Sequence, residues 1–453
     1  MSHRINWEFT STKSVNYNFR WKYYPGRVNY REYQYSSTLP NSKLKMINVF
    51  QNYSEIGDKQ KFFINLLKYC DDNSLNIFSY IPFTCILSKD SHYKTNISSI
   101  NTLMKILSSF KKPKDNFIPI SYHSLFKLPL KYTFKDTTYN HSVFPFFPKT
   151  FTSTTNYWII KPNDLCQGMG IKLAKTIDDV ISYSKEIFEG IDKVTAEAER
   201  YCKEHNKELI PKTYKAISMV IQKYLDTPLL YYNRKFDIRC FVLIDHCMNV
   251  YFCKEGHLKA CSNEYNIETT DKFSHLTNYS LQKKCENFSK YEQSNEISYA
   301  QFKEALKYQG YNNVDDIFND IIFQMKQLVK LSLSAVGKKI ALIPKVLSFQ
   351  IFGYDFIIDK ELKVYIIEIN DNPGLEISSE LIGKLVPRMV DDAFRLTIDK
   401  VFHTVYSEDV LEKDPMTQEI NYKSKFSLPG YSDNENIFEF LCNINHYPTK
   451  IEI

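Results

Sequence analysis

Three side chains with oxygen donors interrupt two apolar runs of the sequence. Asp355 lies in the run IFGYDFII, and Glu368 and Asn370 lie in the run VYIIEIN. A symmetric turn centred between Glu361 and Leu362 would pair Asp355 with Glu368 across an antiparallel hairpin. The period of two along a strand puts Asn370 on the same face as Glu368. The spacing therefore predicts two carboxylates and an amide on one face of a hairpin.

Two carboxylates that face each other repel, so a positive group is expected between them. A set of Asp, Glu and Asn oxygens suits Mg²⁺ bound to the phosphates of a nucleotide better than it suits zinc. The alternative is a polar, exposed sheet face on which Lys363 supplies the counter-charge. Apolar flanking residues on both faces favour the magnesium site.

The segment WIIKPNDLCQGMGI begins as a strand and ends in a loop with glycines. Gly168 and Gly170 stand two residues apart in a chain that has only 12 glycines, which indicates a backbone purpose. Such a loop can direct N–H groups to phosphate oxygens, and Lys161 at the end of the strand adds a positive charge. An ordinary turn is the alternative, because a GxG pattern alone is weak.

Charged and apolar residues alternate in the segment RKFDIR. Lys235, Asp237 and Arg239 share one strand face, and Phe236 and Ile238 share the other. A solvated sheet face explains this alternation, and a polar wall around a triphosphate and its metal is the functional alternative. A further polar run, SHLTNYSLQK, reads as a loop when it is taken alone.

Several segments have the periodicity of the elements that would position these residues. Apolar residues at helical spacing predict helices at about 59–70 and 315–336, and RKFDIRCFVLI followed by VYFCKEG predicts a β-hairpin. The composition, with 43% hydrophobic residues, excludes dominant disorder, and the net charge of +6 argues against a dedicated nucleic-acid binder. No run approaches the roughly 18 apolar residues of a membrane span, MSHRINWEF lacks a signal-type apolar segment, and the ten cysteines form no CxxC pair. We therefore expect a soluble intracellular protein with reduced thiols.

The order of these segments resembles the tubulin-tyrosine ligase and ligase-like family, whose catalytic core has the ATP-grasp fold. The resemblance covers about residues 77–402, with at least five motifs in family order, and NVFQNYSEIGDKQKFFINLLKYC and KYEQSNEISYAQF also resemble the family. It implies an α/β (α+β) fold with a nucleotide between a central and a C-terminal domain. The boundaries expected are an N-terminal domain at 1–78, a central domain at 79–223, a C-terminal domain at 224–405 and a partly ordered extension at 406–453.

The resemblance also implies a role for each matching residue. The residues expected to contact ATP are Lys161, Gln167, Gly168, Met169, Gly170, Ile171, Gln222, Lys223, Tyr224, Leu225, Lys235, Asp237, Thr277 and Asn278. Arg239 matches a basic residue near the reacting phosphate and is expected to act in catalysis with Lys161 and Glu368. The expected contacts to the incoming amino acid are Lys259 and Lys283. Asp355, Glu368 and Asn370 match the ligands of Mg²⁺.

One position departs from the family pattern. In KEGHLKACS the family usually carries arginine where this chain has Lys259, and that arginine helps to hold the carboxylate of the amino acid. Lysine keeps the charge but loses the bidentate geometry of a guanidinium, which puts the substrate choice or the turnover in doubt. Ala260 stands where a larger side chain is common and is expected to change the shape of the same pocket.

The reaction implied is ATP-dependent amide bond formation through an acyl phosphate, which adds glutamate or glycine to tubulin tails, with tyrosine as the less favoured candidate. The expected partners are the acidic tails, steered by lysines such as Lys111, Lys112 and Lys114, and the free amino acid, with no nucleic acid and no membrane. We expect a monomer in the cytoplasm and cytoskeleton, with cilium, axoneme or basal body as possible sites. The alternatives are a non-catalytic or weakly active microtubule or axoneme protein that keeps the fold, and an ATP-grasp ligase for another acceptor.

Overall fold

The computed structural model describes residues 3–10, 14, 16–23, 28–36, 38–88, 157–163, 170–193, 212–214, 216, 218–413 and 419–446. The chain divides into two compact units. The first contains Met1–Leu66, Leu229–Tyr265 and Cys285–Ile453, and the second contains Leu67–Pro228 and Asn266–Lys284. The helices and several sheets are consistent with the predicted α+β class. The ATP-grasp arrangement and the predicted domain boundaries stay predictions.

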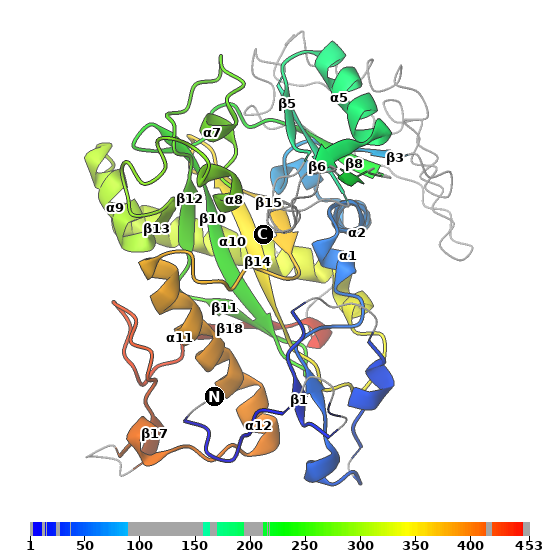
Figure 1. The fold of residues 1–453 in the computed structure, drawn as a ribbon, viewed down its shortest axis with the longest axis vertical. Coiled ribbons are helices and arrows are strands. Elements are labelled where there is room, and N and C mark those ends of the chain that lie inside the picture. Colours follow the sequence, from blue (N-terminus) through cyan, green and yellow to red (C-terminus); the bar gives the residue numbers. More distant parts are fainter. Residues whose placement is uncertain are drawn as a thin grey trace, which may run out of the picture. The chain divides into compact units, whose positions relative to one another are not determined.

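An eight-stranded sheet is the centre of the first unit (Figure 1). Its strands are β9 (Leu230–Tyr231), β10 (Arg234–Ile244), β11 (Asn249–Cys253), β12 (His257–Ala260), β13 (Glu296–Ser298), β14 (Gln350–Ile358), β15 (Val364–Asn370) and β18 (Phe438–Asn443). β10 pairs with β14 along one edge and with β12 and then β11 along the other, always antiparallel. The predicted hairpin is confirmed, because Val242 of β10 lies opposite Phe252 of β11.

Two helices cover the sheet face that presents the even-numbered residues of β10. They are α9 (Tyr299–Tyr308) and α10 (Val314–Val336). The ring of Phe236 in β10 lies 5.3 Å from that of Phe302 in α9, and Ser332 Oγ of α10 lies 2.9 Å from the hydroxyl of Tyr354 in β14. The helix predicted at 315–336 is confirmed as α10, which carries Asp315 and Asp316 in its first turn, at the positive end of its dipole.

The opposite face of the sheet has an apolar half and a polar half. Helices α11 (Glu380–Leu396) and α12 (Ile398–Phe402) pack on the apolar half, where Phe241 of β10 shares a buried cluster with Met389 and Phe394 of α11. Because side chains alternate along a strand, Arg239 of β10 points to this same face. Its neighbour across the strands is Asp355 of β14. On this face of β10 the polar half therefore begins at Arg239, the residue next to Phe241 on the same side of the strand.

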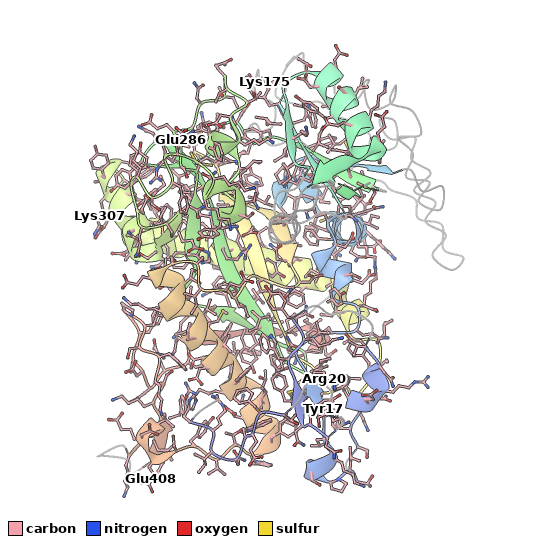
Figure 2. All side chains as sticks on the ribbon, in the orientation of Figure 1. Tyr17, Arg20, Lys175, Glu286, Lys307 and Glu408 are labelled. Carbon is pink, nitrogen blue, oxygen red and sulfur yellow. The ribbon has the colours of Figure 1, made fainter. Side chains whose placement is uncertain are left out.

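The N-terminal segment adds short elements to the first unit. Strands β1 (Phe19–Arg20) and β2 (Met46–Ile47) pair in parallel, and helix α1 (Ser54–Gly57) precedes α2 (Lys59–Asp72). The first unit includes α2 up to Leu66, and the rest of this helix belongs to the second unit. The helix predicted at 59–70 is confirmed as α2. The Arg20 guanidinium lies 4.1 Å and the Lys45 ammonium 4.5 Å from the ring centre of Tyr17, and Figure 2 labels Tyr17 and Arg20. These cation–π contacts stabilise the β1 end of the unit.

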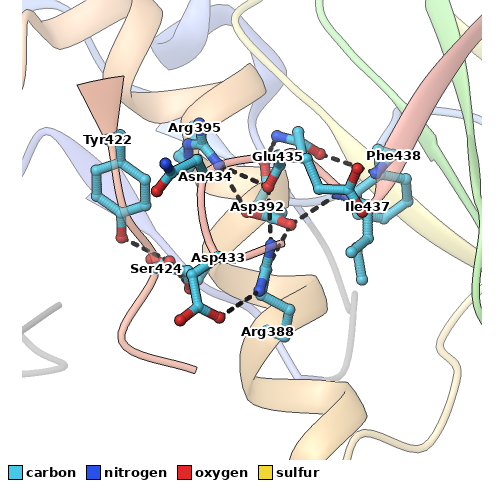
Figure 3. A network of polar contacts seen from close by, with 12 residues as sticks. Arg388, Asp392, Arg395, Tyr422, Ser424, Asp433, Asn434, Glu435, Ile437 and Phe438 are labelled. Carbon is cyan, nitrogen blue, oxygen red and sulfur yellow. Dashed lines mark hydrogen bonds and ion pairs between the residues drawn. The ribbon is translucent and has the colours of Figure 1, made fainter. Parts of the chain in front are cut away.

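The C-terminal segment, predicted to be a partly ordered tail, contributes to the main sheet. Strand β18 pairs with β11, after a hairpin of β16 (Leu411–Lys413) and β17 (Ile420–Tyr422). Figure 3 shows how α11 holds this segment. Arg388 of α11 donates hydrogen bonds to the carbonyl oxygens of Phe426, Ser432 and Glu435. Residues 419–446 are thus an ordered part of the first unit.

The second unit contains a smaller antiparallel sheet in the order β3–β8–β4–β5. Its elements are β3 (Thr84–Ser88), β4 (Trp158–Pro162), β5 (Lys172–Ala174), α5 (Ile177–Glu189), β6 (Ile191–Lys193), β7 (Lys212–Tyr214), β8 (Ser218–Lys223), α7 (Lys272–His275) and α8 (Tyr279–Gln282). A capping box formed by Thr176 and Asp179 starts α5. No helix within the described ranges of either unit combines the length and apolar character that crossing a membrane requires.

Candidate active site

The hairpin of β14 and β15 places Asp355 opposite Glu368, as predicted. The turn itself is centred on Glu361, half a residue earlier than predicted, because Ile358 lies opposite Val364. A β-bulge after Asp355 inserts one extra residue in β15 and restores the pairing of the two carboxylates. The prediction of the acidic pair is confirmed, and the symmetric hairpin from which it was derived is wrong.

Asp355 is the most enclosed member of this group, with 1% of its surface exposed. Arg239 donates two hydrogen bonds to its carboxylate, from Nε at 2.7 Å and from Nη2 at 2.8 Å. Lys259 Nζ lies 2.9 Å from the first carboxylate oxygen, and Asn370 Nδ2 lies 2.9 Å from the second. Burial alone would raise the pKa of Asp355, but Arg239 and Lys259 lower it by more, so this carboxyl stays ionised.

The positive groups beside Asp355 are not the one that the alternative interpretation expected, which was Lys363 on an exposed sheet face. The Lys363 ammonium lies over the ring of Tyr365, 5.4 Å from its centre, and Asp355 is buried against Arg239 and Lys259. Glu368 is the open member of the acidic pair, with 23% of its side chain exposed and the Lys59 ammonium 3.8 Å away. The exposed-face interpretation is therefore wrong for this hairpin.

Asp355, Glu368 and Asn370 converge closely enough to fit a small cation. Asn370 Nδ2 lies 2.9 Å from Asp355 Oδ2 and 3.3 Å from Glu368 Oε1. Rotation of this amide by half a turn would present its oxygen beside the two carboxylates, which gives the hard oxygen donors that Mg²⁺ prefers. Among the described residues no group of three His, Cys, Asp or Glu side chains has metal-binding geometry. The predicted set contains only two carboxylates, and its role as a magnesium site stays a prediction.

The polar face of β10 is buried rather than solvated. Lys235 and Asp237 are each 8% exposed, and the Lys259 ammonium lies 3.4 Å from Asp237 Oδ1. Burial lowers the pKa of Lys235, partly offset by Cys261 and Asp237. For Lys259 burial acts in the same direction, but Asp237 and Asp355 outweigh it and raise its pKa. Lys259 therefore remains a cation that bridges two carboxylates.

Gly353 borders the predicted site, and the sequence interpretation missed it. It faces the site from β14, opposite Asn370. A methyl group at this position would lie 2.9 Å from Pro373 Cβ and only 3.2 Å from Arg239 Nη1. A glycine inside an otherwise apolar strand marks such a close approach and was the available signal. Lys59 gave no such signal, because only the fold brings it beside Glu368.

The second unit brings the predicted residues of β4 and β8 into one buried chain of hydrogen bonds. Lys161 Nζ donates to Gln222 Oε1 at 3.0 Å, and Gln222 Nε2 donates to Thr84 Oγ1 at 3.0 Å. The next residue, Lys223, places its ammonium 5.6 Å from the ring centre of Trp158. Burial lowers the pKa of Lys223 to about 8, although Asp226 acts in the opposite direction. The side chains of Gln222 and Lys223 thus have structural partners within the second unit, and both residues belong to the predicted contacts to ATP.

His275 connects Tyr224 to the segment before Thr277 and Asn278, and these three residues are all predicted contacts to ATP in the second unit. Its Nε2 lies 2.9 Å from the carbonyl oxygen of Thr269, which can only accept, so Nε2 carries the proton. Its Nδ1 therefore accepts the hydrogen bond from the Tyr224 hydroxyl at 2.9 Å. Thr277 and Asn278 follow directly, between α7 and α8.

The remaining predicted residues of the second unit are only partly described. Gly170 has a φ of 72°, a left-handed conformation that favours glycine, and Ile171 precedes β5. Lys283 ends α8 and places its ammonium 5.8 Å from the ring centre of Tyr279. Gln167, Gly168 and Met169 lie outside the described residues, as do Lys111, Lys112 and Lys114. Leu225 follows Tyr224 and is buried.

The sequence of the chain is similar to those of known proteins. The sequence model described as the tubulin-tyrosine ligase family matches residues 37–405. Tubulin glycylase 3B of Tetrahymena thermophila is 30% identical over 247 residues, which are 54% of this chain and 18% of the relative. Tubulin glycylase 3B of Drosophila melanogaster is 26% identical over 282 residues, which are 61% of this chain and 33% of the relative.

A third relative differs in its named activity. Probable alpha-tubulin polyglutamylase Ttll1 of Tetrahymena thermophila is 27% identical over 287 residues, which are 59% of this chain and 63% of the relative. The aligned part of the chain thus spans less than two thirds of the length of each of these three relatives.

Proposed function

The chain belongs to the tubulin-tyrosine ligase family, and on this premise we propose that it is an ATP-dependent ligase that joins an amino acid to a tubulin tail. Glutamate or glycine is the proposed amino acid, and tyrosine is the less favoured one. The names of the relatives, two glycylases and a polyglutamylase, support this order. The single observation that carries the proposal is the cluster in which Arg239, Lys259 and Asn370 all bind Asp355 beside Glu368.

The proposed reaction has two steps. A carboxylate oxygen of the acceptor attacks the γ-phosphorus of ATP, the bond from that phosphorus to the bridging oxygen breaks, and ADP leaves. The amine of the free amino acid then attacks the carbonyl carbon of the acyl phosphate, loses a proton and displaces inorganic phosphate. The product is an amide, and no side chain of the protein needs to act as a nucleophile.

The residues of the cluster have complementary tasks in this proposal. Arg239 stabilises negative charge on the transferred phosphoryl group, and Asp355 keeps the Arg239 guanidinium in one orientation through two hydrogen bonds. Lys259 is the proposed contact to the carboxylate of the incoming amino acid. Mg²⁺ held by Asp355, Glu368 and Asn370 would neutralise phosphate charge and orient the phosphates. Catalysis is then chiefly a matter of position and electrostatics. The net charge of +6 would favour encounter with an acidic tail.

The test is an incorporation assay with microtubules, ATP, Mg²⁺ and a panel of labelled glutamate, glycine and tyrosine. The proposal expects label in tubulin with the parent chain and none with Glu368→Gln, which keeps the shape of the side chain and removes its charge. Absence of label with every amino acid would contradict the proposal. Fluorescence microscopy of the tagged protein tests the location that this substrate implies, on microtubules of the cytoplasm or of a cilium.

One observation favours a second candidate, a microtubule-binding protein without transfer activity. Lys259 has a single ammonium, and that group is engaged by Asp237 at 3.4 Å and by Asp355 at 2.9 Å. A lysine so engaged has less capacity to hold a substrate carboxylate than a guanidinium would have. Co-sedimentation with microtubules that is equal for the parent and Glu368→Gln, without transfer by the parent, would support this candidate.

A further inference from the structure

His257 is a buried histidine on the polar face of the main sheet that neither the motifs nor the proposed mechanism uses. It is the first residue of β12 and lies directly opposite Arg239 of β10, with Ser298 of β13 on its other side. Residues opposite each other in an antiparallel pair point to the same face. His257 therefore shares the face of Arg239 and Asp355, and it is 5% exposed.

Within the described part of the chain, Nδ1 of His257 is fully buried and has no hydrogen-bond partner. Its ring contact is with Phe241, at 6.2 Å between ring centres. A buried polar group without a partner costs about 1–3 kcal/mol, which an apolar side chain of similar size would avoid. The chain thus retains an unfavourable group in the middle of the predicted site, which indicates that a ligand satisfies it.

The charges around His257 indicate which kind of ligand would satisfy it. Burial, then Arg239, then Lys259 lower the pKa of the imidazole far below its ordinary value, with Asp355 acting in the opposite direction. The ring is therefore neutral, with one N–H donor and one acceptor nitrogen. Arg239 and Lys259 near the ring favour a ligand with negative charge. An anionic oxygen would also accept the strongest hydrogen bond from the N–H donor, because hydrogen bonds to charged groups are stronger than those to neutral groups.

We propose that His257 is a further substrate-binding residue, whose imidazole N–H donates a hydrogen bond to an oxygen of the transferred phosphoryl group beside Arg239. This proposal rests on the proposed function, because that function places a phosphoryl group at Arg239. The bond adds a neutral donor to the two cations, so it increases the affinity for the phosphoryl group without adding charge to the site. Apolar packing against Phe241 is the competing explanation, and a phenyl ring would serve that purpose equally well.

The test compares three proteins: the parent, His257→Phe and His257→Gln. Phenylalanine keeps the ring and removes the donor, whereas glutamine restores a donor on a side chain of similar length. The probes are ADP alone and ADP with beryllium fluoride, a mimic of the phosphoryl group, both with Mg²⁺ and titrated by calorimetry. His246→Phe is the matched control, because it makes the same exchange in the turn after β10, away from Arg239.

The expected result for His257→Phe is unchanged affinity for ADP and about tenfold weaker affinity for ADP with beryllium fluoride, as loss of one charge-assisted hydrogen bond implies. His257→Gln should recover most of this loss, and His246→Phe should show none. Equal affinity of His257→Phe and the parent for the fluoride complex would overturn the proposal and leave the proposed function intact. Equal weakening for both probes, with a lower melting temperature, would show a packing role and also overturn it. A parent that binds neither probe would overturn both proposals.

Discussion

Two buried ion-pair clusters of the first unit differ in the groups that bind their charged side chains. Arg388 and Asp392 in α11 are both 0% exposed, and the other partners of Arg388 are mainly carbonyl oxygens of the C-terminal segment (Figure 3). In the cluster of Asp355, the carboxylate is held by the side chains of Arg239, Lys259 and Asn370, and Glu368 at the rim is 23% exposed.

The difference separates charge that holds a fold from charge that receives a ligand. Backbone carbonyls fix Arg388 in a position that no ligand can share, so this cluster is complete. Side chains such as Lys259 and Asn370 can rotate toward a ligand, and the open rim gives access to them. Buried charge alone therefore does not indicate a site, but an open rim and side-chain partners do.

The largest expected effect concerns the rim of the Asp355 cluster. Glu368→Gln should reduce ligation about a thousandfold, because it removes a charge from the predicted metal set. The free energy of unfolding should change by less than about 1 kcal/mol, since Glu368 is partly exposed and its ion pair is weak. Incorporation of labelled amino acid and urea unfolding measure the two quantities. A large loss of stability would show that Glu368 holds the fold as Arg388 does.

The opposite result is expected for the closed cluster. Arg388→Met should lower the free energy of unfolding by about 3–5 kcal/mol. The substitution removes the guanidinium that the buried Asp392 carboxylate and three carbonyl oxygens bind. Urea unfolding measures this change. Lys384→Met is the control, since Lys384 lies in the same helix and forms an exposed pair with Glu380. Equal stability of Arg388→Met and the control would contradict the comparison.

A smaller effect is expected where the two halves of the sheet face meet. Gly353→Ala should lower kcat about tenfold and the stability by about 1–2 kcal/mol, because the added methyl group displaces the Arg239 side chain and Pro373. Gly374→Ala is the matched control, as no atom lies within 4 Å of a Cβ built there. If both variants keep full activity, Arg239 does not need its present position.

The smallest effect is a pH dependence that should be nearly absent in the working range. The folded pKa of Asp355 lies below its ordinary value of 3.8, so its ionisation stabilises the fold fully above 3.8 and loses this effect as the pH falls through the folded pKa. The difference in unfolding free energy between the parent and Asp355→Asn should be constant from about pH 5 to about pH 8. It should shrink only at more acidic pH. A slope near neutral pH in urea unfolding would show that Arg239 and Lys259 do not hold the carboxyl ionised.

The sequence predicted the local part of the site better than the long-range part. Alternation and turn symmetry paired Asp355 with Glu368, because both lie in one hairpin and the side-chain period of a strand is fixed. The same reasoning failed for the bulge, since nothing in VYIIEIN distinguishes a regular strand from a bulged one. It also could not find Lys59, because the contact with Glu368 depends on packing between segments far apart in the sequence.

The fold was predictable to a similar degree. Helices α2 and α10 follow from apolar spacing, and the β10–β11 hairpin follows from two apolar runs and a turn. The pairing of β18 with β11 was not predicted, since the extension at 406–453 was expected to be only partly ordered. Contacts with the rest of the first unit hold that segment, among them the hydrogen bonds of Arg388 to its carbonyl oxygens and the burial of Leu428, Ile437 and Phe438 in the core.

The pairing of β11 with β18 also constrains how the protein is made. Asn249 and Asn443 contact each other although 194 positions separate them. A ribosome that has completed β10 and β11 must therefore extend the chain past residue 443 before β18 can pair with the free side of β11. During that interval β11 presents an unpaired edge, which is open to association with other chains. We expect the growing chain to need protection by chaperones until β18 emerges, and removal of residues 438–443 to cause aggregation rather than a simple loss of activity.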